Sequence, residues 1–238
     1  FGALLADRPR FEAKTFTDPG VHTGNVSKKI ILDDAPLGDE RFERVREGRD
    51  IVPFGCASPR KWLWVEPSLD PGEYCTIRAL ARYTGVPILV RQTADRPIAA
   101  RHTERTYFRN SLLACGGVGG VPDTVVVAFL NSALYAWLHR KAAMDANQKA
   151  FPQVKIRHLQ SLPAIPVEAL SRSTSGGRVS DLMDVVVQEL ETITRDDEER
   201  RTDRLLTLER YVLEAFDLPA EAATLLWRAV NDPMQARS

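Results

Sequence analysis

The residues most suggestive of catalysis form a glycine-rich stretch, SLLACGGVGGVPDT, between Ser111 and Thr124. This stretch has an apolar run, then a glycine cluster, then a helical pattern. Loops that hold a dinucleotide or S-adenosylmethionine at a helix N-terminus have the same order. No Lys-Ser or Lys-Thr pair follows the glycines, so the stretch is not a phosphate-binding P-loop. About 20 residues further on, where a ribose-binding carboxylate should end the next strand, the sequence has Arg140 and Lys141. The pattern favours a flexible strand-to-helix loop over a cofactor site.

Nucleophilic and metal-binding side chains show no catalytic spacing either. Cys115 has no recognisable signature with any of the four histidines, and a buried structural thiol is its ordinary role. The three cysteines (Cys56, Cys75 and Cys115) are far apart, which indicates a reducing compartment without a disulfide framework. The histidines lack the spacing of metal ligands, so we expect no metal site. The pair Asp33–Asp34 lies beside a turn, where solvation is a more common role than acid–base catalysis.

Basic and amide side chains gather instead at the ends of predicted strands. The segment 88–93 begins apolar on both faces and ends in Arg91, Gln92 and Thr93, so it should run from the core to a polar rim. Further residues of this kind are Arg96, Arg101, Arg105, Arg109 and Asn110. Arg and Gln can make bidentate contacts to base edges, and Arg, Lys, Thr and Asn can hold phosphates. Surface ion pairs would have the same composition, so residue type alone leaves both roles open.

Charge is distributed unevenly along the chain, although the net charge is zero. Through Gln160 there are 23 Lys and Arg residues against 17 Asp and Glu, and the remainder has 9 against 15. A basic portion joined to an acidic one is typical of a nucleic-acid surface with a separate structural appendage, although many ordinary proteins show as much.

The composition is that of an ordinary globular protein, with 238 residues of which 44% are hydrophobic and 27% charged. The longest uncharged run, 124–139, is shorter than the roughly 20 residues that a membrane-spanning helix needs, so we expect no membrane partner. The chain begins at Phe1, in the middle of a pattern. We interpret it as a piece cut from a longer protein, although N-terminal processing would give the same start.

Short β-like runs separated by turn residues are expected to position the basic side chains. Candidate strands lie at 28–32 (KKIIL), 61–66 (KWLWVE), 87–93 (PILVRQT) and 109–115 (RNSLLAC). A long helix is predicted over 124–141, after Pro122. Because it is apolar nearly all round, it should pack deeply against the sheet.

Beyond this helix, the stretch NQKAFPQVKIRHLQSLPAIP is predicted to be extended, because its Phe-Pro pair disfavours helix. Alternation would turn Val154 and Ile156 to one side and Lys155 and Arg157 to the other. An edge strand with a solvated charged face and a binding surface both fit this pattern.

The remainder of the chain is predicted to be helical. The stretch 171–178 (SRSTSGGR) resembles a flexible linker. Apolar stripes at helical spacing follow over 179–193 and 205–216, and Pro219 restarts a short helix. The charged run RDDEERRTDR between the first two stripes is typical of a solvated turn.

Six segments in this order resemble the C-terminal specificity domain of the TaqI-like adenine DNA methyltransferases, which include Type IIG and related restriction–modification and phage-defence enzymes. The segments are VHTGNVSKKIIL, REGRDIVPF, PILVRQTADRPIAA, FRNSLLA, VVVAFLNSALYAWLHR and KAFPQVKIRHLQSLPAIP. The likeness extends from about Val21 to Pro166, and acidic helices continue beyond it as in many family members. Each segment alone is a weak match, but all six in this order are fairly specific for the family.

Together with these patterns, the resemblance implies an α+β fold. We expect a β-rich target recognition domain at 1–166 with a packed long helix, followed by a helical C-terminal segment at 171–238. In the family this domain binds double-stranded DNA and recognises its sequence. An N-terminal domain of the parent chain binds S-adenosylmethionine and methylates adenine. The Asn-Pro-Pro-Tyr/Phe motif that holds the flipped adenine is missing, since none of the five asparagines begins one. The resemblance therefore implies a cytoplasmic, non-catalytic fragment without a cofactor of its own.

Nine residues of the matching segments are expected to contact DNA, chosen by side-chain type because recognition positions vary within the family. They are Thr23, Asn25, Lys28, Arg49, Arg91, Gln92, Arg96, Arg109 and, behind these, Lys155. Phe151 and the pair Leu162 and Ile165 are implied to be packing anchors. One alternative is a protein-interaction module whose acidic helices dock a methyltransferase partner, as the helices of Type I specificity subunits do. Another is an enzyme that uses the glycine-rich loop.

Overall fold

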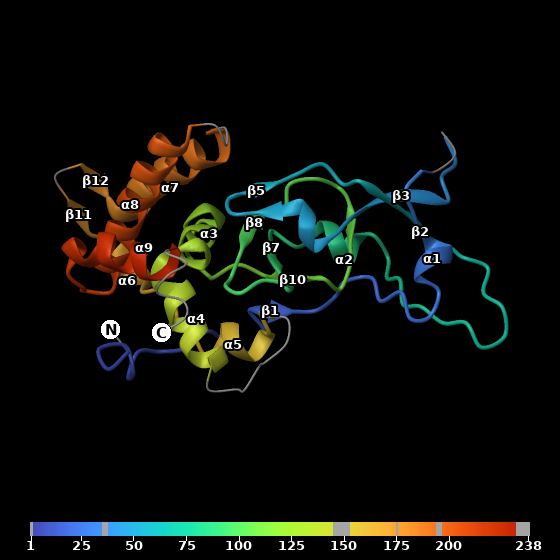
Figure 1. Ribbon diagram of the computed structural model, residues 1–238, viewed down its shortest axis with the longest axis horizontal. Helices are drawn as coiled ribbons and strands as arrows, with labels where there is room; N and C mark the ends of the chain where they lie inside the picture. Colours follow the sequence, from blue (N-terminus) through green and yellow to red (C-terminus); the bar gives the residue numbers. More distant parts are fainter. Residues whose placement is uncertain (1, 35–37, 145–152, 175, 194–196, 232–238) are drawn as a thin grey trace.

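The computed structural model describes residues 2–34, 38–144, 153–174, 176–193 and 197–231. Helices gather at one end of the elongated molecule and a small sheet lies at the other, with a second sheet between them (Figure 1). The combination of helices and small, largely antiparallel sheets confirms the predicted α+β class.

The sheet between the two ends, called the central sheet here, is antiparallel throughout. Its strands, in spatial order, are β1 (Phe16–Thr17), β10 (Leu112–Cys115), β7 (Ile88–Arg91) and β8 (Ala99–Arg101). Leu112 pairs with Arg91, and Cys115 pairs with Ile88. Two of the predicted strands, 87–93 and 109–115, are thus confirmed at their apolar centres.

The second sheet, called the outer sheet here, is mixed. Its strands, in order, are β2 (Ile31–Leu32), β6 (Lys61–Trp64), β3 (Phe42–Arg46) and β9 (Tyr107–Phe108). β3 and β9 are parallel, and the other pairs are antiparallel. β9 of the outer sheet and β10 of the central sheet are separated only by residues 109–111. This short turn therefore joins the two sheets.

The central sheet is buried on both faces, which explains its continuous apolar strands. Ile88 and Val90 of β7 belong to a large core shared with the helices. Leu89 belongs to a smaller core shared with the outer sheet. Because successive side chains of a strand point to opposite faces, Arg91 follows Leu89 toward the outer sheet.

The helix predicted over 124–141 is two helices, α3 (Asp123–Asn131) and α4 (Ala133–Met144). They break at Ser132, whose backbone is extended with φ −67° and ψ 153°. The Ser132 hydroxyl donates to the Phe129 carbonyl and accepts the backbone N–H of Tyr135. Ser is a preferred residue at a helix start, but the apolar pattern runs straight through this position and concealed the break.

The C-terminal helices are α7 (Val179–Thr192), α8 (Glu198–Ala215) and α9 (Ala223–Asn231). Their apolar stripes were predicted and pack into the large core, with α7 against α3 and α9 against α4. Most of the charged run predicted to be a turn forms the first turns of α8 instead. The predicted boundary near 166–171 stays a prediction, and the large core extends across it.

Three other segments differ from their predictions. Within 28–32, a helical turn, α1 (Ser27–Ile30), precedes β2, because Val26 and Ile30 are both buried at helical spacing. After 153–155, helix α5 (Ile156–Gln160) replaces the predicted extended run, and Leu159 and Leu162 are buried at helical spacing. The predicted linker includes β11 (Ser173–Thr174) and β12 (Gly177–Arg178), which pair as a hairpin.

Short elements complete the described part of the chain. They are the 3-10 helices η1 (Gly48–Asp50) and η2 (Ala220–Ala222), the strands β4 (Ile51–Val52) and β5 (Gly55–Cys56), and the helices α2 (Ala81–Thr84) and α6 (Val167–Leu170). None of the described helices is both long and apolar enough to cross a membrane.

Candidate nucleic-acid interface

An open depression of about 750 Å³ lies between the central and outer sheets. Its charged lining residues are Lys28, Arg49, Lys61, Arg91 and Arg109, with the two carboxylates Asp33 and Glu47. Its remaining lining residues are Ser27, Ile31, Gly48, Thr93 and Ser111. With five cations against two anions, the depression suits an anionic ligand. We call it the basic depression.

Each cation comes from a different element, so the depression exists only in the folded chain. Lys28 lies on α1, Arg49 on η1, and Lys61 begins β6. Arg91 ends β7, and Arg109 lies in the turn that joins the two sheets. Four of these five residues were predicted to contact DNA, and the structure brings those four together.

Two of the arginines share one carboxylate. Glu47 Oε1 accepts a hydrogen bond from Arg109 Nη1 at 2.6 Å, and Glu47 Oε2 lies 2.8 Å from Arg49 Nη2. The Glu47 side chain is only 14% exposed, whereas that of Arg49 is 54% exposed. The carboxylate therefore lies deep in the depression, and Arg49 extends from it toward solvent.

The other cations have different surroundings. Arg91 donates from Nε to the carbonyl of Thr93 at 2.9 Å, and within the described part of the chain neither Arg91 nor Lys28 has a carboxylate partner. Lys61 forms an ion pair with Asp33, and this hydrogen bond lowers the pKa of the exposed Asp33 carboxyl. Lys28 and Arg91 are thus the cations of the basic depression with no internal counter-ion.

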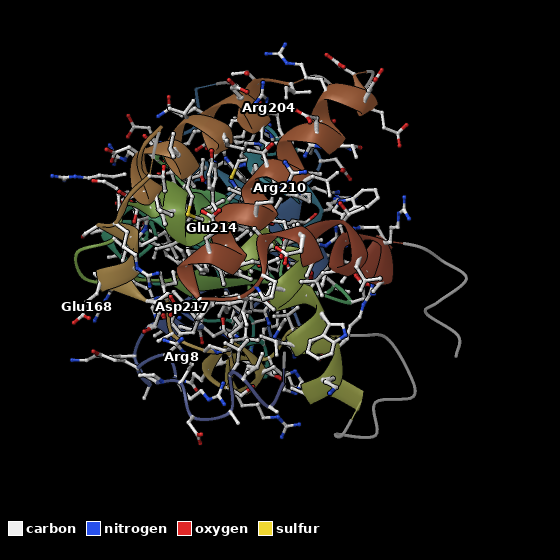
Figure 2. All side chains as sticks on the ribbon, turned by 90° about the vertical axis from the view of Figure 1, so that its left-hand side faces the viewer. Arg8, Glu168, Arg204, Arg210, Glu214 and Asp217 are labelled. Atoms are coloured by element: carbon white, nitrogen blue, oxygen red, sulfur yellow. The ribbon has the colours of Figure 1, made fainter. Side chains whose placement is uncertain are left out.

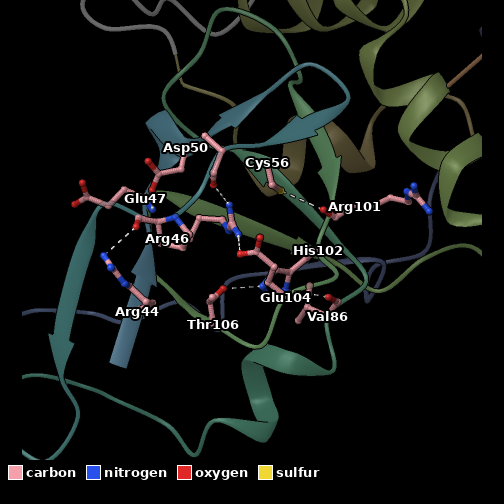
Figure 3. A network of polar contacts seen from close by, with 12 residues as sticks. Arg44, Arg46, Glu47, Asp50, Cys56, Val86, Arg101, His102, Glu104 and Thr106 are labelled. Carbon is pink, nitrogen blue, oxygen red and sulfur yellow. Dashed lines mark hydrogen bonds and ion pairs between the residues drawn. The ribbon is translucent and has the colours of Figure 1, made fainter. Parts of the chain in front are cut away.

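A polar network around the buried Arg46 adjoins Glu47 (Figure 3). Arg46, which is fully buried, donates to the Ala57 carbonyl and forms a 2.6 Å ion pair with Glu104. The carbonyl of Arg46 in turn accepts the backbone N–H of Arg109 at 2.9 Å. The network therefore fixes the end of β3, from which Glu47 follows, against the turn that carries Arg109.

Gly20 allows a third segment to approach this turn. A Cβ atom at Gly20 would lie 2.5 Å from the backbone nitrogen of Asn110 and 2.6 Å from the carbonyl carbon of Arg109. The neighbouring Val21 donates to the Phe108 carbonyl and accepts the N–H of Asn110. Because only glycine lacks the Cβ, this position requires it.

The remaining predicted contact residues lie outside the basic depression. Thr23 is buried, and the Asn25 amide bonds the Gly72 carbonyl and the Tyr74 N–H. Arg96 donates to Asn231 Oδ1 at 2.7 Å, at the edge of the helical end. Their side chains thus have roles within the fold, and a contact with DNA stays a prediction for each.

Gln92 and Lys155 are brought near one another, because the N–H of Val154 donates to the Gln92 carbonyl. Gln92 precedes Thr93 of the depression, but neither Gln92 nor Lys155 lines it. Of the implied packing anchors, Leu162 and Ile165 are buried in the large core, and Phe151 lies outside the described residues.

Sequence reasoning missed Lys61 and Glu47. Lys61 begins a predicted strand, but its strand has no polar end of the kind that marked Arg91. Glu47 lies within the matching segment REGRDIVPF, but only basic, amide and hydroxyl side chains were considered as contacts. The sequence carries no signal that a carboxylate there would lie between two arginines.

The glycine-rich stretch turns tightly before α3, where Val118 and Val121 form a β-bridge. The Asp123 carboxylate, in the first turn of α3, lies 3.4 Å from where a Cβ of Gly117 would be. An anionic side chain beside the glycines disfavours an anionic ligand there. Cys115 is buried, and burial raises the pKa of its thiol to about 11, so the thiol is inert at neutral pH. The described residues include no cluster of three or more His, Cys, Asp or Glu that could hold a metal ion.

A comparison with known protein families agrees with the expectation drawn from the sequence. A family model described as the TaqI-like C-terminal specificity domain matches residues 44–164, which is more than half of the chain and includes Arg49, Lys61, Arg91 and Arg109. None of the curated proteins matches. A solved structure titled "Structural basis underlying complex assembly and conformational transition of the type I R-M system" has 12% identity and a TM-score of 0.36. The match covers 90% of this chain and 50% of that one, so the chain spans about half of that structure's length.

The family match covers the basic depression apart from its α1 side, and it confirms the resemblance predicted from the ordered segments. A specificity domain is the module by which restriction–modification enzymes recognise their DNA target. This chain belongs to the family of TaqI-like C-terminal specificity domains.

Proposed function

We propose that this chain recognises double-stranded DNA through the basic depression, as the target recognition module of an adenine-specific DNA methyltransferase. The observation that carries the proposal is the convergence of five cations from five separate elements on one open surface. Basic side chains clustered on one face are the electrostatic feature expected of a protein that neutralises phosphates.

The shape of the depression favours a polymer over a small anion. It is open to solvent, and its five cations come from five separate parts of the chain. Lys28 and Arg91, for which the described residues supply no counter-ion, suit phosphates, because a phosphate can supply the missing negative charge. Arg49 and Arg109, which Glu47 holds in position, suit base edges, because bidentate hydrogen bonds require fixed geometry.

S-adenosylmethionine and methyl transfer would belong to an N-terminal domain of the parent chain. Two features of this chain support that division. It lacks the Asn-Pro-Pro-Tyr/Phe motif, and its glycine-rich stretch closes as a turn with the Asp123 carboxylate beside it. The role proposed for this chain is to select the sequence, so that the partner domain can act on an adenine within it.

Docking of a partner through the acidic helices is the alternative. The apolar stripes of α7, α8 and α9 are already packed into the large core, and the large apolar side chains that these helices still expose are the separate residues Val185 and Leu225. We therefore favour the DNA-binding role, in which the converging cations have a direct use.

Fluorescence anisotropy with the purified chain and a labelled mixed-sequence duplex tests the proposed function. We expect binding that weakens with salt, with a slope of log K on log[salt] between about −2 and −4 for two to four neutralised phosphates. Absence of binding at low salt, or binding that salt does not affect, would contradict the proposal. A methyl-transfer assay on the same preparation tests the division of labour: we expect no incorporation, and incorporation above background would contradict it.

A further inference from the structure

Glu47 is an unexpected residue in a surface that is proposed to bind a polyanion. Its carboxylate lies among the cations of the basic depression, where it opposes the attraction of phosphates of any sequence. It is also the group that holds the guanidinium groups of both Arg49 and Arg109. The Glu47 carboxylate therefore weakens binding to DNA of any sequence and orders two arginines that can contact bases. This combination suggests a role in sequence selectivity.

The backbone around Glu47 is held on both sides. Its N–H donates to Asp50 Oδ2 at 2.8 Å, and the N–H of Gly48 donates to Ser111 Oγ at 3.0 Å. On the other side, the buried Arg46 fixes the end of β3 through Ala57 and Glu104. The position of the carboxylate is therefore set by the fold, so it can serve as a rigid anchor for flexible arginines.

Arg49 and Arg109 differ in how much of each side chain stays exposed beside Glu47. Arg109 Nη2 is 3.5 Å from Ser27 Oγ, a weak contact, and the Arg109 side chain is 24% exposed. Arg49 is 54% exposed and has Glu47 as its ion-pair partner. Both guanidinium groups thus have N–H groups that a ligand in the depression can reach, while their ion pairs with Glu47 fix their orientation.

We propose that Glu47 is a specificity-determining positioning residue of the DNA site, an inference that rests on the proposed function. It holds Arg49 and Arg109 in one geometry and offsets part of their attraction to phosphates. Specificity is a difference between affinities, so a group that weakens binding to all sequences and preserves base contacts increases it. A guanidinium released from Glu47 would instead bind whichever phosphate is nearest, without regard to sequence.

Asp217 provides a matched control at the helical end of the molecule. Figure 2 shows Arg8 and Asp217 on that face. Asp217 also holds two arginines, Arg8 at 3.1 Å and Arg172 at 2.7 Å. Asp217→Asn therefore removes the same charge from the same kind of three-residue cluster, and Asn tolerates the positive φ of 59° at this position.

The test compares the full chain with its Glu47→Gln and Asp217→Asn variants. Sequences enriched by the unmodified chain from a randomised duplex pool serve as the preferred ligand, and a scrambled duplex of equal composition serves as the reference. For Glu47→Gln we expect about three- to ten-fold tighter binding to the scrambled duplex, with a salt slope steeper by up to about 0.9. The preference for the enriched duplex should fall at least about five-fold, because a bidentate base contact is lost. Asp217→Asn should change neither quantity.

The outcomes separate this inference from the proposed function. If the unmodified chain binds no duplex, the proposed function fails and the inference fails with it. If it binds but Glu47→Gln leaves the preference unchanged, only the inference is overturned. If the chain binds duplex DNA but enriches no sequence at all, its proposed role in selecting the sequence fails together with the inference. Should Glu47→Gln unfold, Arg49→Lys and Arg109→Lys replace it, since they keep the charge and lose the planar fork. We expect those variants to lose preference while retaining affinity for the scrambled duplex, and an unchanged preference would overturn the inference.

Discussion

The same chemical cluster, one carboxylate between two arginines, occurs in two regions of this molecule with different consequences. At the helical end, Asp217 joins Arg8 of the N-terminal segment to Arg172 beside the β11–β12 hairpin, on an exposed surface. In the β region, Glu47 holds Arg49 and Arg109 inside the basic depression. Asp217 and Arg172 also line a depression, of about 380 Å³, whose charged lining residues are one cation and the two anions Glu214 and Asp217. The clusters thus differ in the charge around them: we expect the cluster among anions to link segments weakly, and the cluster among cations to present oriented donors to an anionic ligand.

The two regions are also stabilised differently. The helical end is built on one large apolar core, in which Phe129, Tyr135 and Phe216 pack their rings together. The β region has a smaller core, and its short strands depend on buried polar groups such as Arg46, Asp50 and His102. Substitutions in the helical region should therefore act on stability, whereas substitutions of the cations in the basic depression should act on ligand binding.

Removal of the helical region should have the largest effect. A chain that ends at Ser171 lacks α7, α8 and α9, and so exposes the apolar faces of α3 and α4 that these helices cover. We expect it to be largely insoluble or to lose cooperative thermal unfolding, measured by circular dichroism. Any soluble fraction should still bind duplex DNA. A truncated chain that unfolds normally and no longer binds would place the DNA surface in the helical region and contradict the account.

Gly20→Ala should have the next largest effect, in the β region. The new methyl group would overlap the backbone of Arg109 and Asn110, which cannot move without disturbing the turn between the sheets. We expect a loss of at least about 4 kcal/mol in the free energy of unfolding, measured by urea denaturation. Gly119→Ala is the control, because nothing lies within 4 Å of its Cβ position and its φ is not positive. Equal stability of the two variants would contradict the close approach at Gly20.

Glu209 should make the stability of the helical region depend on pH. Its carboxyl accepts the backbone N–H groups of Ala133 and Leu134 at the start of α4. Burial raises its pKa from 4.5 to about 7, although these hydrogen bonds act in the opposite direction. The folded chain therefore keeps this proton between pH 4.5 and 7 while the unfolded chain loses it, so the contribution is fully present below pH 4.5 and is lost as pH rises.

Glu209→Gln, which cannot titrate, isolates this contribution. Relative to the variant, the unmodified chain should lose about 3 kcal/mol of stability as pH rises from 4.5 to 7, from 1.36 kcal/mol per pKa unit. Urea denaturation of both proteins at several pH values measures the difference. A difference that stays constant, or that increases with pH, would contradict the raised pKa.

Arg91→Ala should have the smallest effect of these variants, and only on binding. Because Arg91 has no carboxylate partner among the described residues and bonds only the nearby Thr93 carbonyl, we expect the free energy of unfolding to change by less than about 0.5 kcal/mol. If Arg91 contacts a phosphate, binding should weaken about equally for preferred and scrambled duplexes, and the salt slope should decrease by about 1. A loss confined to the preferred duplex would indicate a base contact instead.

The sequence predicted well those features that depend on a local period. The strands around Ile88 and Leu112 and the stripes of α7 and α8 follow directly from apolar spacing. The break at Ser132 was hidden, because the apolar pattern continues through it. The helical turn of α1 could not be predicted either, because the residue types from Lys28 to Leu32 are typical of a strand. Only the structure shows that Val26 and Ile30 are both buried.

The candidate site could be predicted only in part. Lys28, Arg49, Arg91 and Arg109 were chosen by side-chain type, but their convergence depends on contacts between elements far apart in the chain. Asn25 was also chosen by side-chain type, but its contacts lie within the fold. Its amide suits a base edge, yet it bonds backbone groups of Gly72 and Tyr74, nearly fifty residues away. A single sequence carries no signal that distinguishes these two outcomes.

The salt dependence of duplex binding, compared between the two regions, tests the central claim most directly. The double variant Lys28→Gln, Arg91→Gln removes two cations without ion pairs from the basic depression. The control, Arg200→Gln, Arg210→Gln, removes two exposed cations from α8. We expect the first to reduce the salt slope by about 1.8 and the second to leave it unchanged. Equal slopes for all three proteins, or a loss confined to the α8 variant, would show that the basic depression is not where DNA binds.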